Sequence, residues 1–503
     1  MEILNNLLIG FDAVLTGKTL LFCFAGVLLG TLIGVLPGIG PVATIAMLLP
    51  FTLSLSDPIH SILMMSGIYY GAQYGGSTSA ILLNMPGEAS SIMTTLDGYK
   101  MAQQGKAGSA LTISALGSFF GGIVGTIIVC IVAIPLMDLS LKFGPIEYTS
   151  LMILALIGSV FISTNSFIIG VGMICLGLLI STVGSDVTSG ANRFIFGQPF
   201  LQNGVSFAIM AIGLFGLSEI FYNIFTVNNS TINQTDKNKK LYYFNKDDVK
   251  RSSMPILRGT LIGSILGIIP GGGVLISSVA AYILEKKISK NPEKFGSGMI
   301  EGVAAPESAN NAAAQTSFIP LLTLGIPFTP VMSMILATMT INGVIPGPQL
   351  MTENSLLFWT IIASFAIGNI LLLLLNLPLV KIWVKIISTP KIILYPIIIV
   401  VCVVGSYSIN NSWKEVVFLL IPFTLLGLFF KKIKVDSAPL LLGYIVGVLL
   451  EENLRRSLLI HDGNFFIFLQ QPISLFLLCI SAALVLISIF QKKNFFFNSI
   501  TNK

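Results

Sequence analysis

Long hydrophobic stretches recur along the whole chain. Several have about 18 residues or more, which is enough for an α-helix to cross the roughly 30 Å hydrocarbon core of a bilayer. Segments of about ten residues with alternating hydrophobicity, the signature of an outer-membrane barrel, do not occur. The pattern predicts an all-α polytopic membrane protein, and its clearest hydrophobic segments are 18–51, 107–137, 146–183, 203–226, 259–285, 354–380 and 472–490.

Two of these segments contain the same helix-breaking motif. Residues 30–40 read GTLIGVLPGIG and residues 263–273 read GSILGIIPGGG, and the two align without a gap. Proline ends a helix because it lacks a backbone donor, and glycine permits the turn that follows. The matched proline and glycines predict two repeats, each with a Pro-Gly re-entrant hairpin.

A polar stretch follows each of these motifs. The first is YYGAQYGGSTSAILLNMPGE at 69–88, and the second is EGVAAPESANNAAAQTSFIPLLTLGIPFTP at 301–330. Both combine Ser, Thr, Asn and Gln with small residues, and both reach a proline after a short apolar run. We therefore expect each repeat to contain a broken, polar helix after its hairpin.

The placement of basic residues indicates how the repeats are oriented. Lys and Arg residues flank 259–285 on both sides, so the positive-inside rule places both ends in the cytoplasm and predicts that this segment turns back. Loop 88–108 carries two lysines, whereas loop 343–356 carries no Lys or Arg. The repeats are therefore expected to be inverted, as in many secondary transporters.

This topology gives a domain organisation. We expect an N-terminal transmembrane unit at 1–225, a cytoplasmic linker at 226–258 and a C-terminal transmembrane unit at 259–503. Arg193 and the Arg455–Arg456 pair are exceptions, because they lie in loops that the topology places outside.

A helix break at membrane depth indicates a binding site. Unpaired backbone groups survive there only inside protein or beside an aqueous cavity, and exposed helix ends attract ions. The alternative is that the glycines only allow close helix crossings and the polar residues only bond between helices. The candidate substrate-binding residues are Pro37, Gly38, Gly40, Ser77, Thr78, Ser79, Asn84, Pro270, Gly271, Gly272, Gly273, Asn310, Asn311, Thr316 and Ser317, with Gln315 in the same cluster.

Glu307 is the candidate coupling-ion residue, because a charge inside the membrane is costly and is usually functional. It would carry a proton or help to hold a cation, or else cap a helix at the membrane surface. Neither Pro-Gly motif contains Lys or Arg, so the charge of an anionic substrate would be met by helix ends, hydroxyls, amides and a co-bound cation.

Composition and motifs exclude several other classes. With 54% hydrophobic and 10% charged residues, the chain is not a soluble protein, and its net charge of +6 sits in short loops rather than in a surface for nucleic acid. It contains no HExxH, P-loop or CxxC motif, so we expect no enzyme, ATP-driven pump, metal site or organic cofactor. The N-terminus lacks the basic region and cleavage site of a removable signal peptide.

Several motifs resemble the large permease subunit of the tripartite tricarboxylate transporters, the TctA family. They are GVLPGIGP, YYGAQYGGSTSAILLNMPGE, TTLDGYKMAQQGKAGSAL, EGVAAPESANNAA and LTLGIPFTPVMSMILATMTINGVIPGPQLM, and the likeness runs from about residue 18 to residue 475. The resemblance implies a multi-pass permease of the bacterial inner membrane. It also implies a small membrane subunit and a periplasmic solute-binding protein as partners, and transport driven by a sodium or proton gradient.

The predicted function is uptake of a di- or tricarboxylate, such as citrate, by cation symport. The alternatives are another organic anion on the same scaffold, a channel-like pore, or an intramembrane hydrolase, although no His or Asp accompanies Ser77 or Ser79 as a base. The sequence leaves open which carboxylate is carried, whether sodium or a proton is coupled, the oligomeric state, and the role of the Asp97-Gly98-Tyr99 stretch, which would be a turn if it were a solvated loop.

Overall fold

The structure is a computed structural model that describes residues 2–36, 40–53, 55, 57–162, 166–186, 189–226, 246–269, 273–379, 382–383 and 391–490. Within these ranges the chain is helical apart from loops and one short antiparallel ribbon, β1 (Gly184–Ser185) with β2 (Asn192–Arg193). Five helical segments of the described chain are long and apolar enough to cross a membrane: Gly17–Val35, Ala107–Ser140, Phe207–Phe225, Ser355–Asn376 and Trp413–Lys432. The prediction of an all-α polytopic membrane protein is confirmed, and only the last of these segments was missed.

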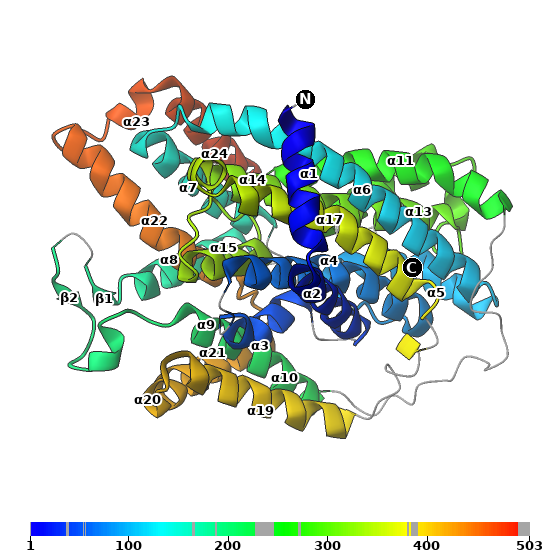
Figure 1. Cartoon of the computed structure of the whole chain (residues 1–503), viewed down its shortest axis with the longest axis horizontal. Helices are drawn as coiled ribbons and strands as arrows, with labels where there is room; N and C mark the ends of the chain where they lie inside the picture. Colours follow the sequence, from blue (N-terminus) through cyan, green and yellow to red (C-terminus); the bar gives the residue numbers. More distant parts are fainter. Residues whose placement is uncertain are drawn as a thin grey trace.

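The first part of the chain supplies the helices up to residue 226 (Figure 1). These are α1 (Glu2–Leu15), α2 (Gly17–Val35), α3 (Pro41–Leu53), α4 (Pro58–Leu83), η1 (Ala89–Ser91), α5 (Ile92–Gln103), α6 (Ala107–Ser140), α7 (Pro145–Ile162), α8 (Phe167–Ser181), η2 (Pro199–Leu201), α9 (Phe207–Ala211), the π-helical turn η3 (Ile212–Leu217) and α10 (Ser218–Thr226).

The second part begins at residue 246 in the described chain. Its helices are α11 (Lys246–Ile268), α12 (Gly273–Ile288), η4 (Pro292–Lys294), α13 (Glu301–Thr316), α14 (Phe318–Leu324), α15 (Pro330–Ile341), α16 (Pro348–Glu353), α17 (Ser355–Asn376), α19 (Lys391–Asn410), α20 (Trp413–Glu415), the π-helical turn η5 (Val416–Leu420), α21 (Ile421–Lys432), α22 (Ala438–Ile460), α23 (Ile467–Gln470) and α24 (Pro472–Phe490). Residues 246–258 of the predicted linker thus form the start of α11.

Both Pro-Gly motifs interrupt helices as predicted. The first separates α2 from α3 and the second separates α11 from α12. The helix after each break starts in the same way, because the Thr44 hydroxyl donates to the Gly40 carbonyl (3.0 Å) and the Ser277 hydroxyl donates to the Gly273 carbonyl (2.7 Å). These two pairs lie 233 positions apart, the same offset as the motifs themselves.

Glycines let the helix before each break pack closely on the polar helix that follows. A side chain at Gly26, Gly30 or Gly34 of α2 would collide with the backbone of α4 at Met64, Ile68 and Ala72 respectively. A side chain at Gly259, Gly263 or Gly267 of α11 would collide with α13 around Ala305, Ala309 and Ala313. Close backbone approach of this kind is a main source of helix association in membranes. The same spacing in both pairs is what an internal repeat predicts.

Helices α11 and α12 fold back on each other. The Arg258 guanidinium donates two hydrogen bonds to Glu285, at 2.5 and 2.8 Å, so the two ends of the segment lie together. From Gly259 the rest of α11 contains ten residues, or about 15 Å of helix, which is half of the hydrocarbon thickness. A hairpin of this length cannot cross a bilayer by itself. The side of the membrane on which it opens stays a prediction.

Helices of each half of the chain pack against helices of the other half. Helix α6 packs on α11 and α13 of the second half, whereas α17 packs on α1, α2 and α4 of the first. Likewise α8 packs on α22, and α21 packs on η3 and α10. In Figure 1 the group with α7, α8, α22 and α24 lies at the upper left, and the group with α10, α19 and α21 lies at the bottom. This packing is reciprocal, and the inverted orientation of the halves stays a prediction.

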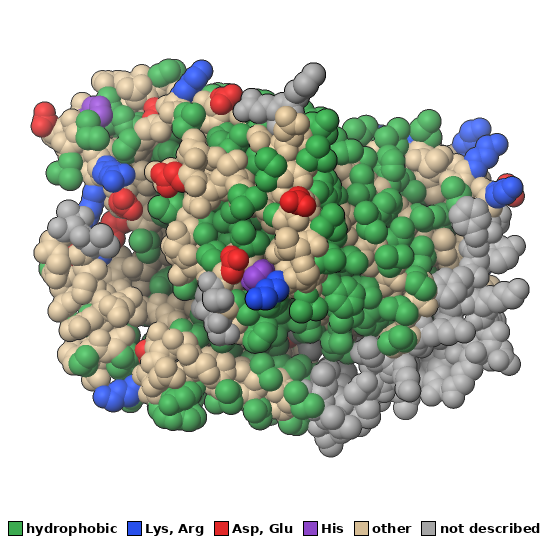
Figure 2. Space-filling model, in the orientation of Figure 1, with side chains coloured by type: hydrophobic (Ala, Val, Ile, Leu, Met, Phe, Trp, Pro, Cys, Tyr) green, Lys and Arg blue, Asp and Glu red, His purple; other side chains and the backbone are tan. Residues whose placement is uncertain are grey.

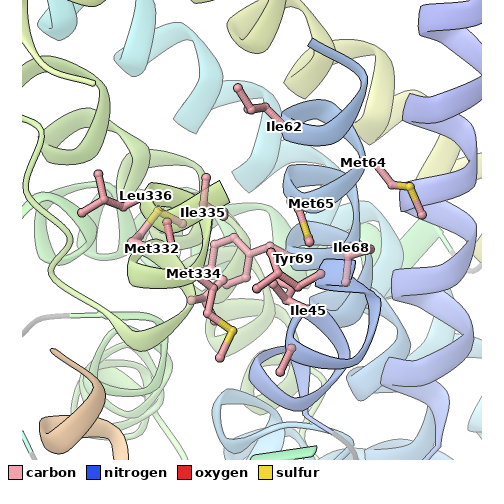
Figure 3. Packing of buried hydrophobic residues seen from close by; sticks show 14 of the residues in the cluster. Ile45, Ile62, Met64, Met65, Ile68, Tyr69, Met332, Met334, Ile335 and Leu336 are labelled. Carbon is pink, nitrogen blue, oxygen red and sulfur yellow. The ribbon is translucent and has the colours of Figure 1, made fainter. Parts of the chain in front are cut away.

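The hydrophobic core joins the halves. Figure 3 shows Ile45 of α3 and Tyr69 of α4 beside Met332, Met334 and Ile335 of α15, and all five side chains are buried. The outer surface is also strongly apolar, because hydrophobic side chains cover much of the face in Figure 2 while charged ones are few and scattered. An apolar surface outside an apolar core is typical of a protein surrounded by lipid.

Two of the three arginines that did not fit the predicted topology, Arg193 and Arg455, have acidic partners in a shared network. Arg193 of β2 donates to Glu451 of α22 at 2.7 and 3.3 Å, and Arg455 donates to Asp186 at 3.0 and 2.8 Å. This ion-pair network ties the β-ribbon to α22 and gives both arginines a local structural role.

Candidate functional site

Helix α13 is polar and yet buried from Gly302 to Thr316. Its sequence EGVAAPESANNAAAQT consists mainly of small residues, and it lies between the glycine faces of two other helices. Gly259, Gly263 and Gly267 of α11 cover one side, and Gly121 and Gly125 of α6 approach Ser308 and Ala312 on another. The small side chains allow this packing, and Glu307 directs its carboxylate at the first half of the chain.

Glu307 of α13 is held by hydroxyl groups from three helices of the first half. Ser77 of α4 and Thr94 of α5 each donate a short hydrogen bond to its carboxylate, and Ser118 of α6 donates at 3.4 Å. Only 1% of Glu307 is exposed, so it does not cap a helix at the surface. No ion pair is made by Glu307 among the described residues. The candidate coupling-ion residue therefore joins both halves through uncharged donors.

A second buried carboxylate, which sequence reasoning missed, lies near the first. Glu88 precedes η1 and accepts a hydrogen bond from Gln73 Nε2 at 3.1 Å, while Ser90 Oγ donates to Gln73 Oε1 at 3.1 Å. Glu88 and Glu307 are close enough to repel each other electrostatically. The sequence contained a signal for this residue, because Glu88 is the last residue of the polar stretch at 69–88. It was missed because a glutamate that follows a proline and a glycine is typical of a solvated loop.

The second hairpin contacts this region. Ser278 of α12 donates to the Ser90 carbonyl at 2.8 Å, so α12 is tied to the first half just beside Glu88. Gly273, where α12 begins, lies next to Thr329, the N-cap of α15, whose hydroxyl accepts from Met332 N at 3.2 Å. The N-terminal ends of α12 and α15 are thus neighbours. Two helix N-termini at one place favour an anion.

Several buried polar atoms near these elements have no hydrogen-bond partner among the described residues. They include both side-chain polar atoms of Asn310, Gln315 Oε1, Glu88 Oε1 and Ser91 Oγ. Buried polar groups are nearly always paired, and an unpaired one costs about 1–3 kcal/mol. Unpaired buried polar atoms of this kind are what a polar ligand or ion would satisfy.

The structure places the other predicted residues as follows. Asn311 Nδ2 donates to the Glu307 carbonyl at 3.1 Å, and a side chain at Gly267 would meet Thr316 Oγ1. Ser79 lies within reach of Gly87, whereas Asn84 is exposed at the C-terminal end of α4 with φ +58°. Thr78 is buried on α4, the Ser317 hydroxyl donates to the Ala314 carbonyl, and a side chain at Gly40 would meet no other atom within 4 Å. The remaining predicted residues lie outside the described residues: Pro37, Gly38, Pro270, Gly271 and Gly272.

Asp97 has a structural role. It is buried on α5, and its Oδ1 accepts from the backbone N–H groups of Gly296, Gly298 and Met299 at 2.7–2.9 Å. Its Oδ2 accepts from the Tyr282 hydroxyl at 2.9 Å. The possibility of a solvated turn at 97–99 is therefore wrong for Asp97. This carboxylate holds the loop between α12 and α13 against the first half.

The donor set restricts the ions that could bind. Within the described ranges no three His, Cys, Asp or Glu side chains come together as metal ligands. The available groups are carboxylate, hydroxyl and amide oxygens, which suit hard cations rather than soft transition metals.

Comparisons with known proteins bear on the whole chain. A model of the tripartite tricarboxylate transporter TctA family matches residues 20–442. An Agrobacterium vitis protein described as an uncharacterized 52.8 kDa protein in the TAR-I ttuC' 3' region is 50% identical over 489 residues, which is 97% of each chain. A second protein of that organism, from the TAR-II ttuC' 3' region, is 49% identical over 45% of this chain and 93% of its own length. No solved structure matches. The chain therefore belongs to the TctA family of tripartite tricarboxylate transporters.

Proposed function

We propose that this chain is the permease that imports a di- or tricarboxylate, of the size and charge of citrate, by symport with a sodium ion or a proton. It would act in the bacterial inner membrane with a small membrane subunit and a periplasmic solute-binding protein. Family membership supports a tripartite transporter. The substrate, the coupling ion and these partners are part of the proposal.

The observation that carries the proposal is the Glu307 junction. A carboxylate of the second half is bound by Ser77, Thr94 and Ser118 of the first half, with no ion-pair partner in the described chain. A buried carboxylate is stable only if it is neutralised or well hydrogen-bonded, so its protonation or cation binding can alter how the halves fit together. This is the element that coupled transport requires.

The anion would bind next to this junction. Helices α12 and α15 present neighbouring N-terminal ends, and the Asn310 and Gln315 amides include atoms without partners. Helix ends and amides can meet carboxylate groups without a basic side chain. A co-bound cation would offset part of the negative charge that the substrate brings next to Glu307. Substrate and cation would then be expected to bind together.

The test is uptake of radiolabelled citrate into proteoliposomes that contain this chain, its small subunit and the binding protein. Gradients of sodium and of protons would be imposed separately. Saturable uptake that follows one of the gradients supports the proposal. Flux that does not saturate and needs no binding protein would indicate a channel. Uptake of a different organic anion without uptake of citrate would support the transporter function but show that the substrate is not citrate.

The site assignment has its own test in the same assay. Asn310→Ala removes an amide with no internal partner, so it should raise the substrate concentration for half-maximal uptake while leaving the fold intact. Asn203→Ala changes an exposed amide that is not among the candidate binding residues and is the matched control. Equal half-maximal concentrations in the two variants would contradict the assignment of Asn310 to the substrate.

A further inference from the structure

Two buried residues beside Gly76, Glu88 and Ser91, each carry an oxygen atom without a partner in the described chain. Glu88 and Ser91 lie over α4 at this glycine: a methyl group added to Gly76 would be 2.8 Å from Ser91 Oγ and 3.2 Å from Glu88 Cγ. By geometric criteria, Glu88 Oε1 and Ser91 Oγ have no hydrogen-bond partner within the described chain. Glycine at position 76 lets both residues approach α4 this closely.

The charge at this site is not balanced by the protein. Glu88 is 9% exposed and Ser91 is fully buried. Glu88 makes no ion pair within the described chain, and the nearby carboxylate of Glu307 adds to the negative charge. This unbalanced negative charge favours a cation.

A bound cation explains the unpaired atoms better than a proton does. A proton on Glu88 Oε1 would create a donor that needs an acceptor, and no acceptor is in hydrogen-bonding geometry. The Ser91 hydroxyl would also remain unpaired. One cation between the two oxygens would satisfy both.

We propose that Glu88 and Ser91 bind a sodium ion, with Gln73 orienting the carboxylate through its hydrogen bond to Glu88 Oε2. Oxygen ligands suit a hard cation, and a single carboxylate matches a single positive charge. This inference adds a location for the coupling ion to the proposed function. The role of the ion in transport rests on that proposed function, whereas the binding of sodium does not.

The site is positioned to affect the second hairpin. Ser90, between the two ligands, offers its carbonyl to Ser278 of α12. Ordering of residues 88–91 around a sodium ion would therefore fix the contact between the first half and α12. The anion site suggested above lies at the beginning of this same helix.

Sodium binding can be measured without transport. The purified chain with its small subunit would be equilibrated in detergent with radioactive sodium, in choline chloride and at fixed pH. Glu88→Gln should raise the Kd by tenfold or more, because it removes the only charged ligand, and Ser91→Ala should raise it by about three- to tenfold. Gly76→Ala should also weaken binding, because its methyl group would displace Ser91 Oγ, which lies 2.8 Å from that position. Glu353→Gln and Gly172→Ala, at exposed positions with free space at the glycine, should leave the Kd unchanged.

Three results would overturn the inference. The first is a wild-type complex that binds no sodium. The second is sodium binding that survives Glu88→Gln and Gly76→Ala but is lost in Glu307→Gln, because the ion would then lie at Glu307. The third is equal displacement of the ion by potassium and by sodium. Carboxylate uptake driven by a proton gradient, without sodium binding, would refute this site and leave the proposed function standing. If Glu88→Gln does not yield a monodisperse complex, Ser91→Ala decides the matter.

Discussion

The Asp97 contacts give the sharpest prediction about stability. Its carboxylate accepts three backbone N–H bonds from the loop between α12 and α13 and a fourth hydrogen bond from Tyr282. These four bonds join the first half of the chain to the second. Replacing Asp97 by alanine would leave those donors to water or without a partner.

The magnitude follows from the geometry. A hydrogen bond to a charged group contributes about 1.5–3 kcal/mol. Three of the N–H groups share one oxygen and are partly exposed, so water would replace some of the bonding. We therefore expect Asp97→Ala to lower the free energy of unfolding by about 4 kcal/mol rather than by the full sum.

Two further substitutions separate the contributions. Asp97→Asn keeps an acceptor oxygen but loses the charge, and charge-assisted bonds are roughly twice as strong as neutral ones, so the expected loss is about 2 kcal/mol. Tyr282→Phe removes one hydroxyl donor and should cost about 1 kcal/mol.

Thermal unfolding of the purified complex, followed by tryptophan fluorescence, would rank the variants. The expected Tm order is wild type, Tyr282→Phe, Asp97→Asn and Asp97→Ala, from highest to lowest. Asp462→Asn, at an exposed position, should melt with the wild type and serves as the control. If Asp97→Ala also melted with the wild type, the Asp97 contacts would not hold the two halves together.

Two other predictions test the packing of the helices and the hydroxyl groups around Glu307. Gly263→Leu should prevent α11 from packing on α13 and reduce the yield of folded protein, whereas Gly172→Leu, where a side chain meets nothing within 4 Å, should not; comparable size-exclusion profiles would contradict this. Thr94→Val removes a donor to Glu307 and should slow uptake by about 10- to 100-fold, as expected for the loss of a 1.5–3 kcal/mol bond. Thr95→Val changes a hydroxyl that bonds only within its own helix and should transport normally, so equal rates would refute the role of Thr94.

Much of the helical framework could be predicted from local chemistry. The breaks before Pro41 and Gly273 follow from Pro and Gly residues, whose effects do not depend on distant contacts. The segment Trp413–Lys432 was missed because charged residues near its ends dilute its hydrophobicity. The packing of α6 and α17 on the other half of the chain could not be predicted, since hydrophobic patterns do not specify which helices become neighbours.

The site was only partly predictable for the same reason. Glu307 was found because a charge inside a membrane segment is unusual wherever it points. Glu88 and Asp97 were not found, because their local sequence is typical of a solvated loop between two helices. Their burial depends on Gln73, on Tyr282 and on loop N–H groups, and Tyr282 and that loop are distant in sequence from Asp97. Only the tertiary structure brings these groups together.

The most direct test of the account is gradient-driven citrate uptake by the complete three-component system, compared between the wild type and Glu307→Gln. The account predicts saturable uptake in the wild type that depends on an imposed cation gradient. It predicts a rate at least tenfold lower for Glu307→Gln, a loss of about 1.4 kcal/mol or more, with Glu353→Gln unchanged. If uptake by the Glu307→Gln variant were as fast and as dependent on the cation gradient as uptake by the wild type, the claim that this buried carboxylate couples the cation to transport would be contradicted.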